Sequence, residues 1–123
     1  MDKKEYTAPS VIPDPEGGGA LFSPQSEKME AWWKAASGLR PVPEVRKARE
    51  DGGFLIVMSA RNLLLYFLNG TARSAFLLMD GQRDLPGIAE ELAGLYSVEK
   101  SRLDSDLKAL AYTLEKYGLI KLR

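Results

Sequence analysis

The sequence predicts an α+β domain in which a small three-stranded antiparallel sheet precedes three helices. Short apolar segments, separated by turn residues, occupy the middle of the chain. Apolar residues at helical spacing fill most of the last third. Between these two regions, six consecutive apolar or aromatic residues (63–68) run directly into Asn69-Gly70-Thr71. A strand with apolar residues on both faces requires cover on both faces, or a partner.

Composition limits the classes of function that this chain can have. Its 123 residues contain 17 Lys plus Arg and 17 Asp plus Glu, and neither cysteine nor histidine. A zero net charge argues against general binding to nucleic acids or anionic membranes. The lack of His and Cys removes the commonest general base and the commonest metal ligands. No apolar run approaches a membrane span, and no signal-peptide pattern follows Met1. We therefore expect a soluble, cytoplasmic protein that is not an enzyme and has no cofactor or metal.

Residues 1–40 are predicted to be an N-terminal arm, and residues 41–123 the main domain. Prolines and a triple glycine indicate a disordered leader over 1–19. Ala20–Pro24 is either a short strand or an anchor, and Ser23 and Pro24 suit a helix start. That helix should end at Gly38, with Trp32 and Trp33 either packed on the chain's own sheet or contacting another protein. Leu39–Pro43 reads as a linker.

The predicted strands cover 44–49, 54–58 and 63–68. A turn at 51–53 separates the first two, and a loop at 59–62 separates the second from the third. The first strand is charged, which suits an exposed edge.

The predicted helices cover 72–80, from Asp84 to about Ser97, and 99–117. Asn69 or Thr71 should cap the first and Asp84 the second, with Pro86 in its first turn; Gly118 should end the third. The tail at 119–122 should pack on the core.

This order of elements is winged-helix-like, which suggests DNA binding by the third helix. That helix carries four acidic and four basic residues, so its net charge is zero and nucleic acid is an improbable partner.

The strand at 63–68 is the strongest functional signal, because it contains neither charge nor proline to blunt an exposed edge. An extended peptide could add to this edge, with its side chains entering the cleft beside the third helix. Alternatively, the chain's own arm covers the edge. A structural homodimer held by the apolar sheet face and the Trp helix is a third interpretation.

The ordered set of helix caps and core residues resembles the PqqD-like family over roughly residues 43–122. The matching pieces are Leu68-Asn69-Gly70-Thr71-Ala72, Phe76, Leu78, Met79-Asp80-Gly81, Ile88-Ala89-Glu90-Glu91-Leu92, Asp106-Leu107, Leu110, Leu114 and Tyr117-Gly118-Leu119-Ile120. These proteins are winged-helix chaperones that recognise the leader of a ribosomally made precursor peptide. The resemblance implies a role in the biosynthesis of coenzyme PQQ or another peptide natural product. The implied partners are a precursor peptide and a modifying enzyme, often a radical-SAM protein, with no membrane.

The resemblance also implies a peptide-binding site between the last strand and the third helix. The residues carried over by position are Leu63, Leu64, Leu65, Tyr66 and Phe67 on the strand, and Asp106, Ala109, Leu110 and Thr113 on the helix. The opposite helix flank, with Asp104, Lys108 and Ala111, is the alternative. Residues 1–40 have no counterpart in the minimal family domain, so the arm could fill the groove, dock on a partner or exchange between two copies.

Overall fold

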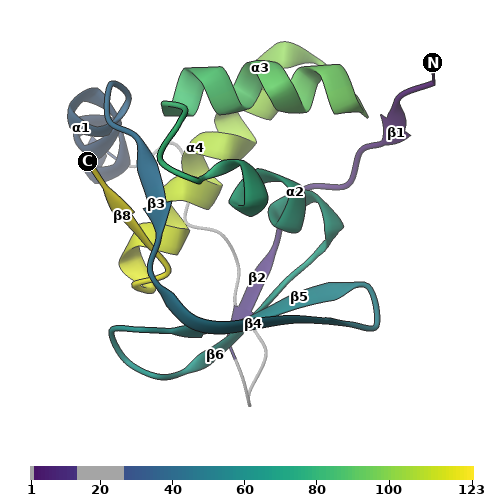
Figure 1. The fold of residues 1–123 in the computed structure, drawn as a ribbon. Coiled ribbons are helices and arrows are strands. Elements are labelled where there is room, and N and C mark those ends of the chain that lie inside the picture. Colours follow the sequence, from purple (N-terminus) through teal and green to yellow (C-terminus); the bar gives the residue numbers. More distant parts are fainter. Residues whose placement is uncertain (1, 14–26) are drawn as a thin grey trace.

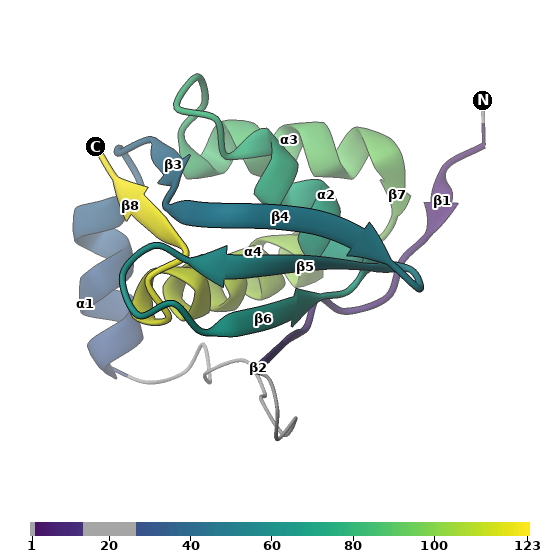
Figure 2. The ribbon, with the colours of Figure 1, turned by 60° about the horizontal axis from the view of Figure 1, so that its bottom comes forward.

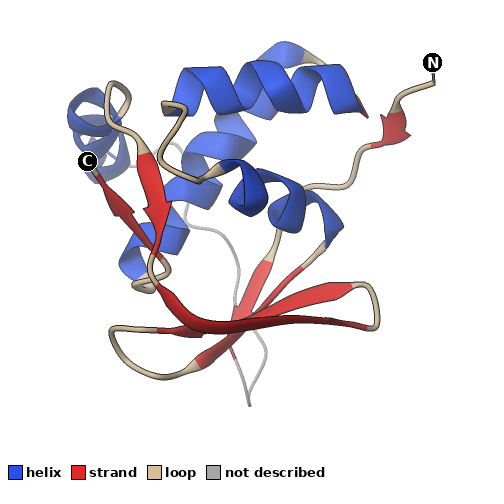
Figure 3. Ribbon diagram, viewed as in Figure 1, coloured by secondary structure: helices blue, strands red, loops and turns tan. Residues whose placement is uncertain are grey.

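All of the described helices lie on one side of a twisted antiparallel sheet (Figure 1). The structure is a computed structural model, and it describes residues 2–13 and 27–123. Figure 3 shows the strands of the main sheet gathered on one side and the helices on the other. The prediction of an α+β protein is confirmed, but the expected count of strands and helices is wrong.

The main sheet has four strands, not three, because a strand from the N-terminal arm joins it. Its order is β2 (Val11–Pro13), β6 (Leu65–Leu68), β5 (Phe54–Ser59) and β4 (Val45–Asp51), with every neighbouring pair antiparallel. Figure 2 shows this sheet from the side that carries no helix among the described residues. The charged strand β4 forms one edge, as expected for an edge exposed to water.

The third predicted strand begins two residues later than expected. Leu63 has a backbone φ of +63°, a left-handed conformation that a strand cannot contain. The Asn62 side chain accepts a hydrogen bond from the Leu64 amide at 2.9 Å, which closes the loop in that conformation. Leu63 and Leu64 are therefore in the loop, with exposed fractions of 53% and 50%.

The three helices after the sheet begin at the predicted caps or within a residue or two of them. They are α2 (Gly70–Leu78), α3 (Leu85–Leu95) and α4 (Lys100–Lys116). Asn69 accepts a hydrogen bond from the Ala72 amide, and Asp84 accepts one from the Gly87 amide. Both caps satisfy backbone donors that a first helical turn leaves unpaired.

A fourth helix, α1 (Glu27–Ala36), packs on the outer side of α4. Met29 is fully buried against Ala109 and Tyr112 of α4. The Trp32 ring meets Tyr112 edge-on, with 5.3 Å between centroids. The expectation that the tryptophans pack on the sheet is thus wrong, because α4 offers an apolar outer face. The expected strand or anchor at 20–24 and the cap at Ser23 lie outside the described residues.

Two small sheets tie the termini to the domain. β3 (Pro41–Pro43) pairs with β8 (Ile120–Leu122), and β1 (Lys4–Glu5) runs parallel to β7 (Tyr96–Ser97). The expected linker at 39–43 is thus partly a strand. Its flanking residues Arg40 and Glu44 donate the backbone hydrogen bonds that the prolines cannot. The expected packing of the C-terminal tail is confirmed, since Leu119 and Ile120 are fully buried.

The hydrophobic core lies between the sheet and α2, α3 and α4. It includes residues of the predicted arm, because Val11 and Ala36 belong to the same buried cluster as the helices. The described residues contain no helix long and apolar enough to cross a membrane.

Candidate functional site

The edge of β6 that was expected to accept a peptide is paired with the chain's own strand β2. Val11, Ile12 and Pro13 lie opposite Leu68, Phe67 and Tyr66, in antiparallel register. The pairing continues one residue further, where the Asn69 amide donates to the Ser10 carbonyl at 3.2 Å. The expectation of a disordered leader is wrong for residues 4–13. The edge of β6 forms backbone hydrogen bonds with this segment, and the core buries its Val11 side chain.

Asn69 and Thr71 hold the arm just beyond this strand pair. The Asn69 side chain accepts a hydrogen bond from the Ser10 amide and donates one to the Ala8 carbonyl at 2.9 Å. The Thr71 hydroxyl donates to the Thr7 carbonyl. All three bonds use backbone atoms of the arm. This part of the site therefore holds the arm through its backbone, and the contacts do not depend on which side chains the arm carries.

Tyr6 anchors the arm to α4 through its side chain. Its hydroxyl donates to the Asp106 carboxylate at 2.6 Å, and the Arg102 guanidinium lies over its ring at 5.0 Å from the centroid. The ring of Tyr96 meets it edge-on, at 5.8 Å between centroids. Burial, and then the bond to Asp106, raise the pKa of Tyr6 well above its ordinary value of 10.

Val11 anchors the arm to the core. Its side chain is fully buried in the cluster that includes Leu68 and the apolar stripe of α4, and β2 contacts α4. Pro9 is also buried, whereas the side chains of residues 2–5, 7 and 8 are exposed. The site therefore distinguishes two side chains above all, an aromatic ring near Asp106 and a small aliphatic group between β6 and α4.

The five residues predicted on the strand do not share one surface. Leu63 and Leu64 are in the loop, and Leu65 lines a shallow cavity of about 400 Å³ on the sheet face that carries no described helix. Phe67 contacts Phe54 edge-on, at 6.2 Å between centroids. Tyr66 alone points inward: only 2% of it is exposed, and its ring stacks on Tyr117 at 4.7 Å.

The four residues predicted on the helix are also divided. Asp106 contacts the arm directly. Ala109 lies beneath Met29 of α1, and Leu110 is in the core. Thr113 is fully buried, and its hydroxyl donates to the Ala109 carbonyl at 2.8 Å.

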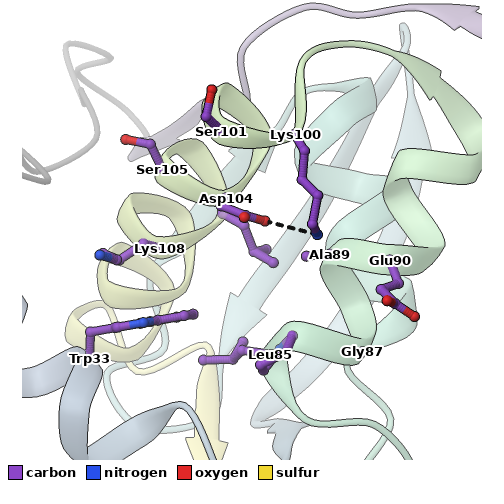
Figure 4. Close-up of a pocket in the computed structure, with 12 residues that line it drawn as sticks. Trp33, Leu85, Gly87, Ala89, Glu90, Lys100, Ser101, Asp104, Ser105 and Lys108 are labelled. Atoms are coloured by element: carbon purple, nitrogen blue, oxygen red, sulfur yellow. Dashed lines mark ion pairs between the residues drawn. The ribbon is translucent and has the colours of Figure 1, made fainter.

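The opposite flank of α4 faces α3, away from β6. Asp104 and Lys108 line a cavity of about 630 Å³ between α1, α3 and α4 (Figure 4). Ala111, by contrast, is fully buried in the core. In that cavity Asp104 pairs with Lys100 at 3.7 Å, and the Lys108 ammonium lies 5.3 Å from the ring centroid of Trp33. The flank beside the β6 edge is therefore the one that carries Asp106.

Several residues of the arm contact were missed by reasoning from the sequence alone. Asn69 was understood only as a helix cap, although it also holds the arm, and Arg102 was counted only as a helix charge. One local signal did exist: two β-branched residues, Val11 and Ile12, lie between prolines in the arm, which is typical of a short strand. Nothing local identifies Asp106 as the partner of Tyr6, 100 residues away.

The described residues contain no group of three or more carboxylate, imidazole or thiol side chains that could hold a metal ion. The β6 edge offers backbone hydrogen-bonding groups, with the Asp106 carboxylate and the Arg102 guanidinium beside it and a buried position that Val11 occupies.

The fold is that of a small α+β domain in which an extended segment of the same chain pairs with β6, beside the longest of the described helices. The chain belongs to the PqqD family: residues 55–120 match the model described as coenzyme PQQ synthesis protein D (PqqD), which covers more than half of the chain. The matched region begins in β5 and ends in β8, so it includes β6 and α4 but not the arm. The chain showed no significant similarity to any curated protein or to any solved structure.

Membership of this family confirms the resemblance seen in the sequence and links the chain to the biosynthesis of coenzyme PQQ or related peptide products. Members are non-catalytic accessory proteins that act with partner proteins.

Proposed function

We propose that the protein binds the leader segment of a ribosomally made precursor peptide at the β6 edge and presents it to a modifying enzyme, such as a radical-SAM protein. One observation carries this proposal: the β6 edge and the Asp106 flank of α4 already hold an extended segment, residues 6–13 of the same chain. A site that binds this segment through backbone atoms can accept another segment of similar shape.

The energetics allow useful affinity. Each backbone hydrogen bond contributes about 1 kcal/mol net, and burying an aliphatic side chain such as that of Val11 contributes about 1.5–3 kcal/mol. Four or five such bonds, with one aliphatic and one aromatic anchor, must exceed the cost of ordering the peptide. Micromolar binding is reasonable on these terms.

Holding the leader would raise the concentration of the substrate core at the enzyme without any chemistry in this chain. The proposal locates the complex in the cytoplasm, where ribosomal precursors are made. Its partners are the precursor peptide and the enzyme.

A DNA-binding role is less well supported by the geometry. The outer side of α4, which would enter a groove of DNA, packs against α1, with Ala109 and Tyr112 buried beneath Met29. The Lys108 ammonium, one of the basic groups of this helix, is paired with Glu30 at 3.1 Å. A homodimer remains an outcome that the following test distinguishes.

The test is an amide chemical-shift titration of the full chain at low and high salt. The probes are synthetic leader peptides encoded by short reading frames beside the gene, a scrambled peptide of the same composition, and a duplex DNA. We expect a leader peptide to shift amides of β6, Asn69 and the Asp106 flank, and the scrambled peptide to shift none of them.

Shifts confined to the cavity around Asp104 and Lys108, or salt-dependent shifts caused only by DNA, would contradict the proposed site. Line broadening that depends on protein concentration without any ligand would support a dimer instead.

A further inference from the structure

The contacts of the arm fall into two kinds. Those along residues 7–13 use mostly its backbone: the carbonyls of Thr7, Ala8 and Ser10, the Ser10 amide and the strand pairing of β2. The side-chain contacts include the Lys3 ammonium on the Ala93 carbonyl and the buried Pro9, and two of them join the arm to Asp106 and to the core: the Tyr6 hydroxyl on Asp106 and the buried Val11. Any extended peptide could reproduce the first kind, but only a peptide with suitable side chains at these two positions could reproduce the second.

We propose that residues 2–13 are a tethered occupant of the peptide site, which a free peptide must displace. We further propose that a peptide able to displace it carries a tyrosine five residues before a small β-branched aliphatic residue, as Tyr6 precedes Val11. The identity of the natural displacing peptide rests on the function proposed above, whereas displacement itself does not.

The strength of this contact favours exchange over permanent attachment. The strand pairing with β6 is only three residues long, and most of residues 2–8 are exposed. Thirteen residues of sequence join Pro13 to Glu27, so an arm released from β6 would stay near its site. Short tethers give an effective concentration of about 1 mM, so an arm whose own dissociation constant is about 10–100 μM should weaken binding of a free competitor about 10- to 100-fold.

If the arm competes with a free peptide, a substitution that weakens docking of the arm should strengthen binding of the peptide. The probe is a fluorescent synthetic peptide with the sequence of residues 2–13, and the readout is its anisotropy with the full chain. Val11→Asp places a charge where the arm is buried, so this variant should bind the probe at least tenfold more tightly than the unsubstituted chain does.

Ala31→Asp is the matched control, since it adds the same charge at an exposed side chain of α1 that has no part in the arm contact. We expect its affinity for the probe to stay within twofold of the unsubstituted chain. Equal affinity in a folded Val11→Asp variant and in the unsubstituted chain would overturn the inference.

A second variant tests displacement without weakening the core. Ile12 and Phe67 are directly opposed in the strand register, so their Cα atoms lie about 4.5–5.5 Å apart, within the range of a disulfide. The chain has no cysteine, so Ile12→Cys with Phe67→Cys would form a single crosslink. We expect the oxidised form to lose probe binding at least tenfold relative to the same protein after reduction. Equal binding by the two forms, or no binding by either, would overturn the inference.

The side-chain pattern is tested in the probe itself, against the Val11→Asp chain. Probes carrying Tyr6→Ala or Val11→Asp should bind at least tenfold more weakly than the original probe, whereas a probe carrying Asp2→Lys, which changes the charge at an exposed position outside the contact, should not. If all of the probes bind alike, the proposed pattern is wrong.

These experiments separate the inference from the proposed function. If the arm peptide exchanges but no leader peptide shifts the β6 amides, the arm is a tethered occupant and the proposed function fails. If a leader peptide binds the oxidised crosslinked form as well as the reduced form, it uses another surface and the inference fails.

Discussion

The Tyr6 hydroxyl donates to the Asp106 carboxylate at 2.6 Å, which joins the N-terminal arm to the middle of α4. The same carboxylate oxygen lies 3.8 Å from the Arg102 guanidinium, which in turn covers the Tyr6 ring. We expect Tyr6→Phe to keep the ring contact and to remove the hydrogen bond, which weakens arm docking by about 1–2 kcal/mol. Hydrogen exchange at the β2 amides should become about tenfold faster, while exchange in the α4 core stays unchanged. Unaltered exchange at β2 would show that the ring alone holds the arm.

Alkaline pH should release the arm through the same residue. Burial and the bond to Asp106 raise the pKa of folded Tyr6 above its ordinary value of 10. A raised pKa means that the neutral hydroxyl is preferred in the docked state, so its contribution is complete below pH 10 and is lost as pH rises through the higher folded value. Arm protection measured by exchange should therefore fall above pH 10, and Tyr6→Phe should remove this dependence. A fall of equal size in Tyr6→Phe would assign it to another group, such as Tyr117, whose pKa burial also raises.

Asn69 has two roles that substitution can separate. Asn69→Asp keeps the acceptor for the Ala72 amide but loses the donor to the Ala8 carbonyl, so it should loosen the arm with little loss of helix capping. Asn69→Ala loses both and should destabilise the protein by about 1–3 kcal/mol in chemical denaturation. Equal losses of stability in the two variants would mean that the cap contributes little.

Met29 makes α1 part of the folded unit. It is fully buried against Ala109 and Tyr112, so Met29→Ala should cost about 2–4 kcal/mol in the free energy of unfolding. Lys28→Ala, at an exposed position of the same helix, should change stability by less than about 0.5 kcal/mol. A loss below about 1 kcal/mol for Met29→Ala would show that α1 packs loosely on α4.

Two glycines near helix ends should respond oppositely to alanine. Gly118 has a φ of +73°, and a Cβ there would lie 3.1 Å from atoms of the Arg61 side chain. Gly118→Ala should therefore cost about 1–2 kcal/mol. Gly94 in α3 has no atom within 4 Å of such a Cβ, so Gly94→Ala should stabilise the protein by about 0.5–1 kcal/mol. Thermal unfolding of the two variants checks both signs, and a destabilised Gly94→Ala would contradict the open space around that position.

Local chemistry made much of the fold predictable. Asp84 was identified as a helix cap, and Asn69 as one of two candidates for another, because such side-chain acceptors reach amides only three residues away. The start of β6 was misplaced because the apolar pattern of Leu63 and Leu64 does not reveal the left-handed backbone of Leu63.

The candidate site was only partly predictable, because its contacts join distant parts of the chain. The strand that flanks the site and the helix that carries Asp106 follow from hydrophobic periodicity and from family resemblance. Which flank faces β6, and what covers the strand edge, depend on packing between Val11, Tyr6 and α4, which no local pattern encodes. The inward and outward sides of β6 also follow from that packing.

The separation between Tyr6 and Asp106 has a consequence for how the protein is made. Residue 6 is synthesised 100 residues before its partner, and Val11 is likewise made well before α4. At about 5–20 residues per second, the arm stays without its docking site for roughly 5–20 seconds. During that interval the nascent arm is an extended segment open to chaperones and proteases, and it docks only when nearly all of the domain has emerged.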